Sequence, residues 1–186
     1  MEFIATLMLL AVSIIVLLTV ISAMVLLFIS TLLTEVPFVP VSKTVIREAL
    51  KRFRGVTNDS VFYDLGSGDG RVVFAFKDAH PETSSTGYEI GPLPYLIAHM
   101  NNALRGSVKA NIQRRDFFKE DLSNGTHIFL YLFPNTMEKL FDKFSRELKP
   151  GTQVISCDFP FRTKAPTDTV EVSDTASKHV LYMYEF

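Results

Sequence analysis

The chain has 186 residues, which is enough for one compact domain and a short additional segment. Its 19 lysine and arginine residues nearly balance its 20 aspartate and glutamate residues, and Glu2 is the only charged residue before position 35. The rest of the chain therefore carries as many basic as acidic side chains, which argues against a dedicated nucleic-acid-binding domain. The single cysteine, Cys157, excludes an intrachain disulfide and fits a reducing compartment.

The first 34 residues are predicted to form a single-pass transmembrane anchor. Residues 3–34 contain no charge, no glycine and no proline. A bilayer core of ~30 Å needs about 20 apolar residues at ~1.5 Å rise per residue, so this segment can span it. A cleaved signal peptide is the alternative, but the acidic start, the length of the run and the missing small-residue cleavage site disfavour it. The remaining domain is too small to enclose such a helix as a core element.

Basic residues follow the apolar segment and predict its orientation. Lysine and arginine are retained on the cytoplasmic side of a membrane, so we expect the domain to face the cytosol or the equivalent compartment of an organelle. These residues could also lie near anionic lipid headgroups or form the solvated face of a helix, and the sequence leaves both possibilities open. The basic residues are Lys43, Arg47, Lys51, Arg52 and Arg54.

Beyond the anchor, helix-like and strand-like segments alternate. Residues 35–60 form a segment of their own, because Pro37 and Pro40 exclude a helix before Ser42, which is a suitable N-cap. Predicted helices cover residues 43–53, 70–79, 94–104 and 134–148. Predicted strands cover residues 61–65, 86–89, 111–116, 126–133, 153–157, 168–172 and 179–186. This alternation predicts an α/β domain over residues 61–186, with a Rossmann-like seven-stranded sheet whose last strands form an antiparallel edge.

A glycine-rich turn follows the first predicted strand. Residues 61–72 read V-F-Y-D-L-G-S-G-D-G-R-V, with Asp64 two positions before the first of three alternating glycines. Glycines at such positions allow bare backbone to approach a nucleoside cofactor where any Cβ would clash. The dinucleotide fingerprint G-x-G-x-x-G would need a glycine at the position of Arg71, so the pattern argues against that class of cofactor.

A second acidic residue follows the next predicted strand. Glu89 ends the run G-Y-E and lies 25 residues after Asp64. In a βαβ nucleotide site an acid about 20 residues beyond the glycine turn binds the ribose hydroxyls. A solvated surface charge is the alternative, but the spacing favours ribose binding. The histidines, at positions 80, 99, 127 and 179, are scattered, and no spacing indicates a metal site.

Five sequence runs occur in an order that resembles one enzyme family. They are V-P-F-V-P-V-S at 36–42, D-L-G-S-G-D-G-R at 64–71, G-Y-E at 87–89, R-R-D at 114–116 and C-D-F-P-F at 157–161. The second is typical of motif I of class I S-adenosylmethionine-dependent methyltransferases. Together they resemble the membrane-anchored protein-lysine methyltransferases that modify the ATP synthase c-subunit and the adenine nucleotide translocase, and their prokaryotic relatives.

The resemblance implies a role for several residues. Asp64 and the turn would bind the methionine part of S-adenosylmethionine, and Glu89 with Ile90 would bind the ribose. Asp116 and Phe117 would contact the adenine, and the proline-containing segment around Pro40 would cover the cofactor unless it is merely a stiff linker. Independently of the resemblance, we expect Tyr131 and Pro134, at the end of the fourth predicted strand, and Phe38 to lie nearest the reacting methyl group, although Tyr131 could instead be a core residue. The turn residues concerned are Gly66, Ser67, Gly68 and Gly70.

The resemblance also implies a substrate, although two positions depart from the family pattern. The family usually has E-L-N-P where this chain has E-I-G-P at 89–92, and arginine where Asp158 stands. We expect a lysine of a membrane-associated protein to be the substrate. A membrane-soluble small molecule such as a quinone or lipid, or a non-catalytic assembly role, are the alternatives. The intact motif I and Glu89 disfavour the non-catalytic role.

Overall fold

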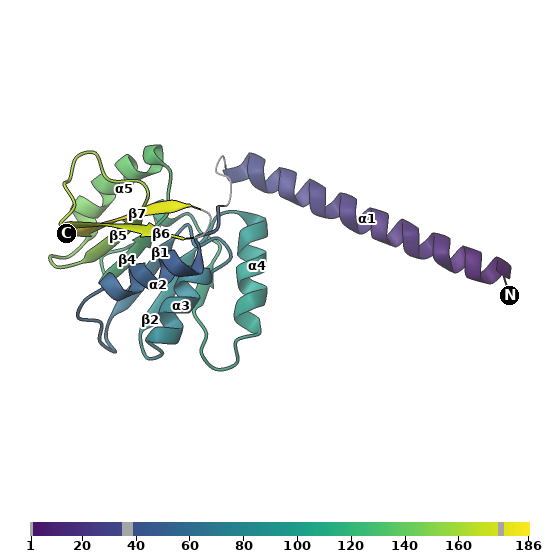
Figure 1. The fold of residues 1–186 in the computed structure, drawn as a ribbon, viewed down its shortest axis with the longest axis horizontal. Helices are drawn as coiled ribbons and strands as arrows, with labels where there is room; N and C mark the ends of the chain where they lie inside the picture. Colours follow the sequence, from purple (N-terminus) through teal and green to yellow (C-terminus); the bar gives the residue numbers. More distant parts are fainter. Residues whose placement is uncertain (1, 35–38, 175–176) are drawn as a thin grey trace. The chain divides into compact units, whose positions relative to one another are not determined.

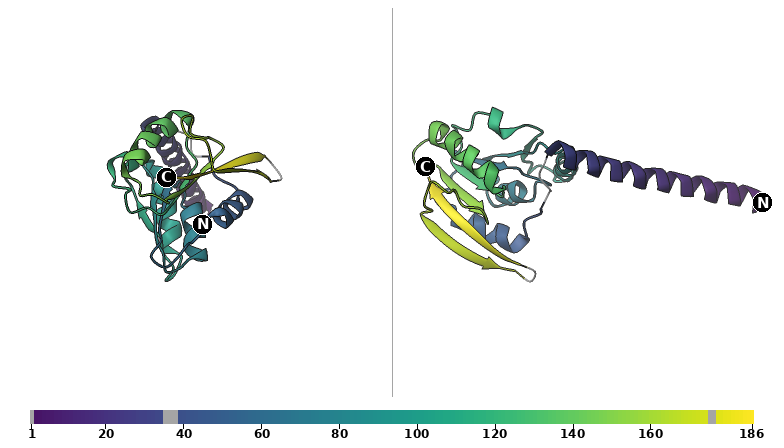
Figure 2. Two further views of the ribbon diagram at one scale, coloured as in Figure 1. Left: turned by 90° about the vertical axis from the view of Figure 1, so that its left-hand side faces the viewer. Right: turned by 90° about the horizontal axis from the view of Figure 1, so that it is seen from above.

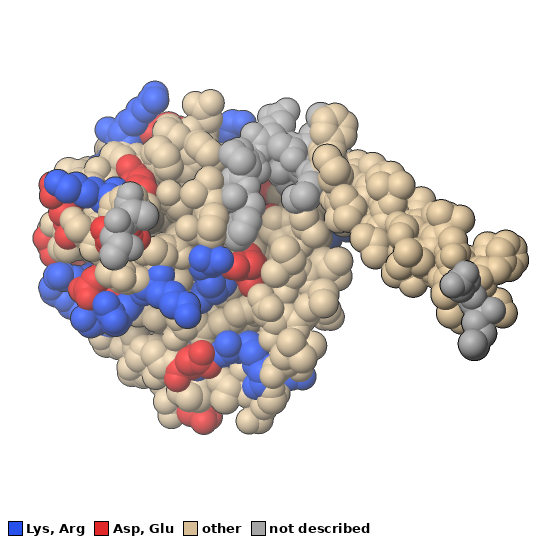
Figure 3. All heavy atoms as spheres, turned by 45° about the vertical axis from the view of Figure 1, so that its right-hand side comes forward, with Lys and Arg blue, Asp and Glu red and all other residues tan. Residues whose placement is uncertain are grey.

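The computed structural model describes residues 2–34, 39–174 and 177–186, which form two compact units divided after Pro37. The first unit is one helix, α1 (Glu2–Thr34). None of the residues from Phe3 to Leu26 is buried within the protein, and this stretch has the length and composition needed to cross a membrane. In Figure 3 the described side chains of α1 in view are all uncharged.

The hydroxyl groups of Ser13 and Thr19 in α1 bond to the helix itself. Ser13 donates to the Leu9 carbonyl at 2.8 Å, and Thr19 donates to the Val16 carbonyl at 2.7 Å. Back-bonding of this kind provides an internal partner for a polar side chain that has no water nearby. These hydroxyl groups are therefore compatible with an apolar environment such as a bilayer.

The second unit is a seven-stranded sheet with helices on both faces (Figure 1). The strand order is β3-β2-β1-β4-β5-β7-β6, in which the first five strands are parallel and β7 pairs antiparallel with both β5 and β6. The predicted fold class, with its antiparallel edge, is confirmed. The strands are β1 (Val61–Leu65), β2 (Ser84–Tyr88), β3 (Asn111–Gln113), β4 (His127–Leu130), β5 (Gln153–Cys157), β6 (Asp168–Ser173) and β7 (Lys178–Glu185).

Alternation along the strands divides the core between the two faces. In β1 the side chain of Phe62 packs with α2 and α3, whereas those of Tyr63 and Leu65 pack with α5. Figures 1 and 2 show the same arrangement, with α2 and α3 on one face of the sheet and α5 on the other. The helices are α2 (Lys43–Arg52), α3 (Arg71–Ala79), α4 (Pro92–Ala103) and α5 (Pro134–Glu147).

Several predicted boundaries were wrong in ways that bear on the site. The predicted strand 111–116 stops at Gln113, and a short 3-10 helix, η1 (Phe117–Lys119), follows it. The predicted strand 126–133 covers only β4, so the apolar residues after Leu130 lie beyond the sheet. The second strand begins two residues earlier than predicted and ends at Tyr88, which leaves Glu89 just outside it.

Candidate functional site

The acidic and glycine-rich motifs meet at the carboxyl ends of the parallel strands. Strand β1 lies in the middle of the parallel part of the sheet, with β2 and then β3 on one side and β4 and then β5 on the other. The strand order therefore reverses between β1 and β4. A crevice outside the strand ends at such a switch point is where open α/β sheets bind their ligands.

The turn between β1 and α3 depends on glycine. Gly66, Gly68 and Gly70 have φ values of 79°, 56° and 84°, a left-handed conformation that side chains with a Cβ rarely adopt. A Cβ at Gly66 would lie 2.8 Å from Cδ2 of Leu132, and one at Gly70 would lie 2.5 Å from the Phe74 ring. The turn therefore excludes larger residues for reasons internal to the protein as well as for ligand access.

The carboxyl group of Asp64 is buried beneath this turn. Its Oδ2 accepts a hydrogen bond from the Val73 amide, in the first turn of α3, at 3.2 Å, and the residue is 3% exposed. Burial raises the pKa of Asp64 to about 8, and the neighbouring charges of Glu89 and Asp69 act in the same direction, while the Val73 hydrogen bond opposes them. The group is therefore mostly protonated at neutral pH until a positive charge comes near it.

The carboxylate of Glu89 holds the turn from the other side. Its Oε2 accepts from the Gly68 amide at 2.8 Å, and its Oε1 accepts from the Gly91 amide at 2.6 Å. Burial raises the pKa of Glu89, and these two hydrogen bonds oppose the shift. A carboxylate has about four acceptor sites, so Glu89 keeps capacity for ribose hydroxyls. Its ribose-binding role stays a prediction.

One further feature of the turn bears on whether S-adenosylmethionine fits. The hydroxyl oxygen of Ser67 is buried and has no hydrogen-bond partner among the described residues. A buried hydroxyl group without a partner is costly, which is expected where a ligand completes the site. One hydroxyl group, two carboxyl groups and a left-handed backbone at one strand edge match the ammonium and hydroxyl groups of that cofactor. The residues present therefore fit it.

Residues 39–42, which we call the strap, are attached to the glycine turn through Arg71. The guanidinium of Arg71 bonds to Asp69 at 2.6 Å and, through Nη1, to the carbonyl of Val41 at 3.0 Å. Val41 is 5% exposed, and Ser42 after it caps α2 by accepting from the Val45 amide. Pro40 is exposed on the same strap, whereas Phe38 lies outside the described residues. The covering role predicted for this segment stays a prediction.

The predicted adenine-binding residues lie on η1. Asp116 is the N-cap of this 3-10 helix, and its Oδ1 accepts from the Phe118 amide at 3.0 Å. The rings of Phe117 and Phe118 lie 4.8 Å apart, and both side chains are half-buried. One oxygen of Asp116 is thus used locally, and its contact with adenine stays a prediction, as does that of Phe117. Ile90 is 51% exposed beside Glu89.

The fold also brings together three residues whose sequence spacing gave no signal. Potential ligand atoms of Cys157, Asp158 and His179 lie within 4.8 Å of one another at the junction of β5 and β7. Asp158 has a φ of 64° and accepts from His179 Nδ1 at 2.8 Å. The amide of Val180 donates to its other carboxylate oxygen at 2.9 Å, so a hydrogen-bonded pair occupies this corner. Strand pairing creates the cluster, which is why the scattered histidines did not reveal it.

Tyr131 stands beside this pair, just after β4. Burial raises the pKa of Tyr131 to about 12, and the charge of Asp158 adds to the shift. Its ring lies 6.3 Å from that of Phe159 in a nearly parallel arrangement. Phe133 is 38% exposed, and Pro134 begins α5. Aromatic side chains therefore line the end of β4, next to Leu132, which contacts the glycine turn.

Fold and site together define a class I S-adenosylmethionine-dependent methyltransferase. The family model of the ANTKMT methyltransferase domain matches residues 64–168, and the chain belongs to this family. A protein-lysine N-methyltransferase from Saccharolobus islandicus (strain REY15A) is 34% identical over 151 residues, covering 81% of this chain and 93% of that protein.

Two mammalian relatives match a smaller share of their own length. The adenine nucleotide translocase lysine N-methyltransferase of Mus musculus is 33% identical over 138 residues, 73% of this chain and 58% of that protein. The ATP synthase c-subunit lysine N-methyltransferase of Homo sapiens is 33% identical over 130 residues, 67% of this chain and 52% of that protein. The chain thus spans little more than half the length of these two relatives.

A solved structure supports the cofactor assignment. An RNA methyltransferase from Salinibacter ruber in complex with S-adenosyl-L-homocysteine is 34% identical and superposes with a TM-score of 0.70, over 79% of this chain and 93% of that one. The expected cofactor is therefore S-adenosylmethionine. Once bound, it supplies an electrophilic methyl group on a sulfonium, and the protein binds it, orients the acceptor and excludes water.

We predict that cofactor binding releases a proton through Asp64. The carboxyl group, with a pKa of about 8, is protonated at pH 7, and a ligand ammonium would favour its ionised form. Calorimetric titration with S-adenosylhomocysteine in phosphate and in Tris at pH 7 should report a net release of protons, which should fall toward zero as the pH rises above about 9. Asp64→Asn should abolish the release, and Asp59→Asn, at an exposed position, should not.

The raised pKa of Asp64 also makes the free energy of unfolding depend on pH. Between pH ~4 and ~8 the folded chain binds the Asp64 proton more tightly than the unfolded chain does, so this group lowers the free energy of unfolding as pH rises through that window. For the calorimetric prediction, equal heats of S-adenosylhomocysteine binding in phosphate and in Tris at pH 7 would contradict proton release from Asp64.

We further predict that Glu89→Ala weakens S-adenosylhomocysteine binding by about 1–3 kcal/mol, because charge-assisted hydrogen bonds to the turn and to the ligand are lost. Glu82→Ala removes an exposed glutamate shortly before the same strand and serves as the matched control. Calorimetry measures both, and circular dichroism checks that the fold survives. If Glu89→Ala binds S-adenosylhomocysteine as tightly as the original chain does, Glu89 does not contribute to cofactor binding.

Proposed function

We propose that this chain methylates lysine side chains of a membrane-associated protein while it is anchored in the membrane by α1. The observation that carries the proposal is the helix Glu2–Thr34, which has no charged residue after Glu2, in a chain whose relatives are named protein-lysine methyltransferases. Two of those names specify the adenine nucleotide translocase and the ATP synthase c-subunit, which are membrane proteins. Basic residues after the helix favour a domain on the cytoplasmic side, or its equivalent in an organelle.

The residues after β4 support an amine substrate. Tyr131 keeps its proton at neutral pH, since its pKa is about 12, so it acts by hydrogen bonding and not as a base. The rings of Tyr131, Phe159 and Phe133 form a chain with centroid separations of 6.3 and 5.8 Å. Aromatic faces favour the positive charge that develops on nitrogen during methyl transfer. Pro134 begins α5 beside these aromatic residues. We propose that Phe38 also lies near the reacting amine.

The remaining requirement is a neutral amine about 3 Å from the methyl group, with water excluded from the reacting atoms. The substrate lysine must lose its proton before it attacks, and solvent can accept that proton because the residues after β4 are accessible, Phe133 being 38% exposed. Methyl transfer then forms the N–C bond while the S–C bond breaks, and S-adenosylhomocysteine leaves. The side chains present orient the amine without an acid–base pair.

Two other acceptors have a specific reason to be tested. The Salinibacter ruber protein is named an RNA methyltransferase. The present chain has nearly equal numbers of basic and acidic residues, however, and so lacks the excess of basic residues typical of RNA-binding proteins. A membrane-soluble small molecule, such as a quinone or lipid, would also be accessible to an anchored enzyme. Both are distinguished from protein by where the methyl group goes.

We predict that radiolabelled S-adenosylmethionine transfers its methyl group to protein when the full-length enzyme is added to membranes of its host. Acid hydrolysis of that protein should release methylated lysine, and enzyme carrying Glu89→Ala should give little label. Label in the lipid extract or in RNA would instead establish one of the two alternatives.

Removal of residues 2–34 should leave S-adenosylhomocysteine affinity unchanged and slow methylation of the membrane-embedded target, because tethering raises the local concentration of enzyme.

A further inference from the structure

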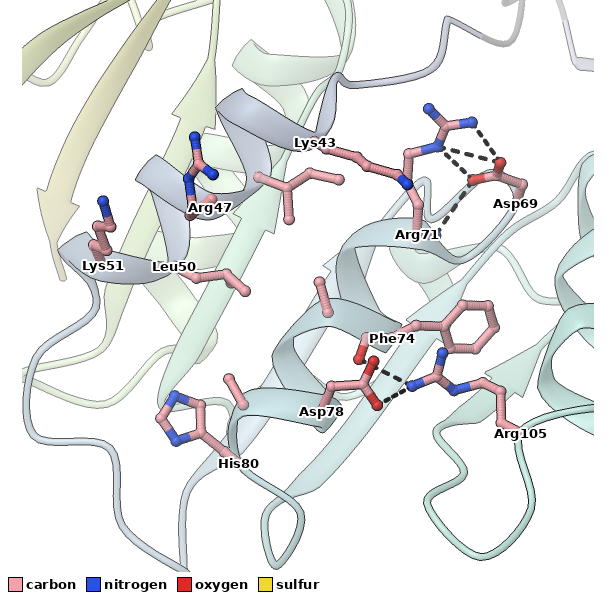
Figure 4. A pocket seen from close by; sticks show the side chains of 13 residues that line it. Lys43, Arg47, Leu50, Lys51, Asp69, Arg71, Phe74, Asp78, His80 and Arg105 are labelled. Atoms are coloured by element: carbon pink, nitrogen blue, oxygen red, sulfur yellow. Dashed lines mark hydrogen bonds and ion pairs between the residues drawn. The ribbon is translucent and has the colours of Figure 1, made fainter.

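A pocket of about 810 Å³ lies between α2 and α3, in addition to the site at the strand ends. Its floor is apolar: Ile46 and Leu50 come from α2, and Phe74 and Ala75 come from α3. Ile46 and Phe74 are buried at 5% and 6% exposure, whereas Leu50 and Ala75 are half-buried. Figure 4 shows Leu50 on the α2 side of the pocket and the Phe74 ring beside the Arg105 guanidinium, which lies 4.7 Å from the ring centroid. The pocket thus offers apolar surface that the fold itself leaves uncovered.

The rim of this pocket is basic. Both of its carboxylates are already paired: Asp69 bonds to Arg71 at 2.6 Å, and Asp78 pairs with Arg105. Figure 4 shows these two ion pairs at one side of the pocket. Arg71 is further engaged by the Val41 carbonyl, so both arginines are largely used within the protein. The acidic groups of the rim therefore do not neutralise its other cations.

Lys43 and Arg47 are the cations that remain. They lie four residues apart on one face of α2, both are exposed, and neither forms an ion pair within the described part of the chain. Lys51, one turn further along, bonds to Glu48 at 2.8 Å. Figure 4 shows Lys43 extending across the pocket toward Arg71, whereas the Arg47 guanidinium points away from Leu50. Two unpaired cations at the rim of a pocket with an apolar floor are complementary to an anionic head group with an apolar tail.

We propose that this pocket binds an acidic phospholipid, with the phosphate at Lys43 and Arg47 and the glycerol and first acyl carbons on the floor. The proposal rests on the membrane-anchored function proposed above. The chain itself favours a lipid over other anionic amphiphiles: α1 ends at Thr34 and α2 begins at Lys43, so the intervening residues can extend over at most about 30 Å. Basic residues that reach a bilayer surface attract anionic lipids.

The test uses the full-length chain in neutral maltoside micelles, without cofactor or substrate. Short-chain dihexanoyl phosphatidylglycerol is titrated and compared with dihexanoyl phosphatidylcholine and with inorganic phosphate, and native mass spectrometry or calorimetry measures binding. We expect phosphatidylglycerol to bind at least tenfold more tightly than either of the other two. Neither the zwitterionic headgroup nor the free anion satisfies both the cations and the apolar floor.

A matched pair of variants locates the site. Lys43→Gln with Arg47→Gln should lower phosphatidylglycerol affinity at least tenfold, as the loss of two such cations implies. Arg52→Gln with Arg54→Gln makes the same change of charge next to the pocket without altering its lining, and should change affinity less than twofold. Retained S-adenosylhomocysteine binding in both variants shows that the fold is intact.

Three results would overturn the proposal: equal affinity for phosphatidylglycerol and phosphatidylcholine, equal affinity for free phosphate, or equal losses in the two double variants. None of these results would affect the proposed lysine methylation, which is read from the methylated product. Conversely, methylation of RNA or lipid in the membrane assay would leave the lipid-binding measurement as it stands.

Discussion

The structure depends on how two carboxyl groups are held against a left-handed glycine turn. Asp64 is buried under the turn and bonds to the Val73 amide, while Glu89 bonds to the amides of Gly68 and Gly91. These contacts join β1, α3 and the residues after β2 into one rigid edge. Burial raises the pKa of both groups, so each retains a strong tendency to pair with a positive or hydrogen-bonding ligand group. The left-handed glycines keep the backbone low enough for such a ligand to approach.

The meeting of the glycine turn with its two acidic residues could be predicted because it depends on local spacing. The sequence has an acid, three alternating glycines and a second acid 25 residues later, and the structure joins Glu89 to the turn, while the contacts of these residues with the cofactor stay predictions. Strand ends were harder to predict, because the apolar run continues past Leu130 into Leu132 and Phe133, which lie beyond the sheet. Local hydrogen bonding from Asp116 produced η1 where a strand was predicted. The Cys157–Asp158–His179 cluster depends on antiparallel pairing between β5 and β7, which no sequence period reveals.

The two units give the enzyme different kinds of constraint. The catalytic domain carries balanced charge and a strand-edge site for a charged cofactor, whereas α1 carries no charge from Phe3 to Thr34. The strap, residues 39–42, belongs to the second unit, and its Val41 carbonyl accepts a hydrogen bond from Arg71, which follows the glycine turn. The basic pocket between α2 and α3 begins with Lys43, the residue after the strap, and Arg71 lines this pocket while it bonds to the strap.

The activity of this chain depends most directly on which cofactor the glycine turn binds. Calorimetric titration of the full-length chain in micelles with S-adenosylhomocysteine, and separately with NAD, measures that choice. Arg71 stands where a dinucleotide site needs its third glycine, and Glu89 secures the turn in the conformation seen here. We therefore expect saturable binding of S-adenosylhomocysteine at one site per chain and no heat with NAD. Binding of NAD without any response to S-adenosylhomocysteine would contradict the account.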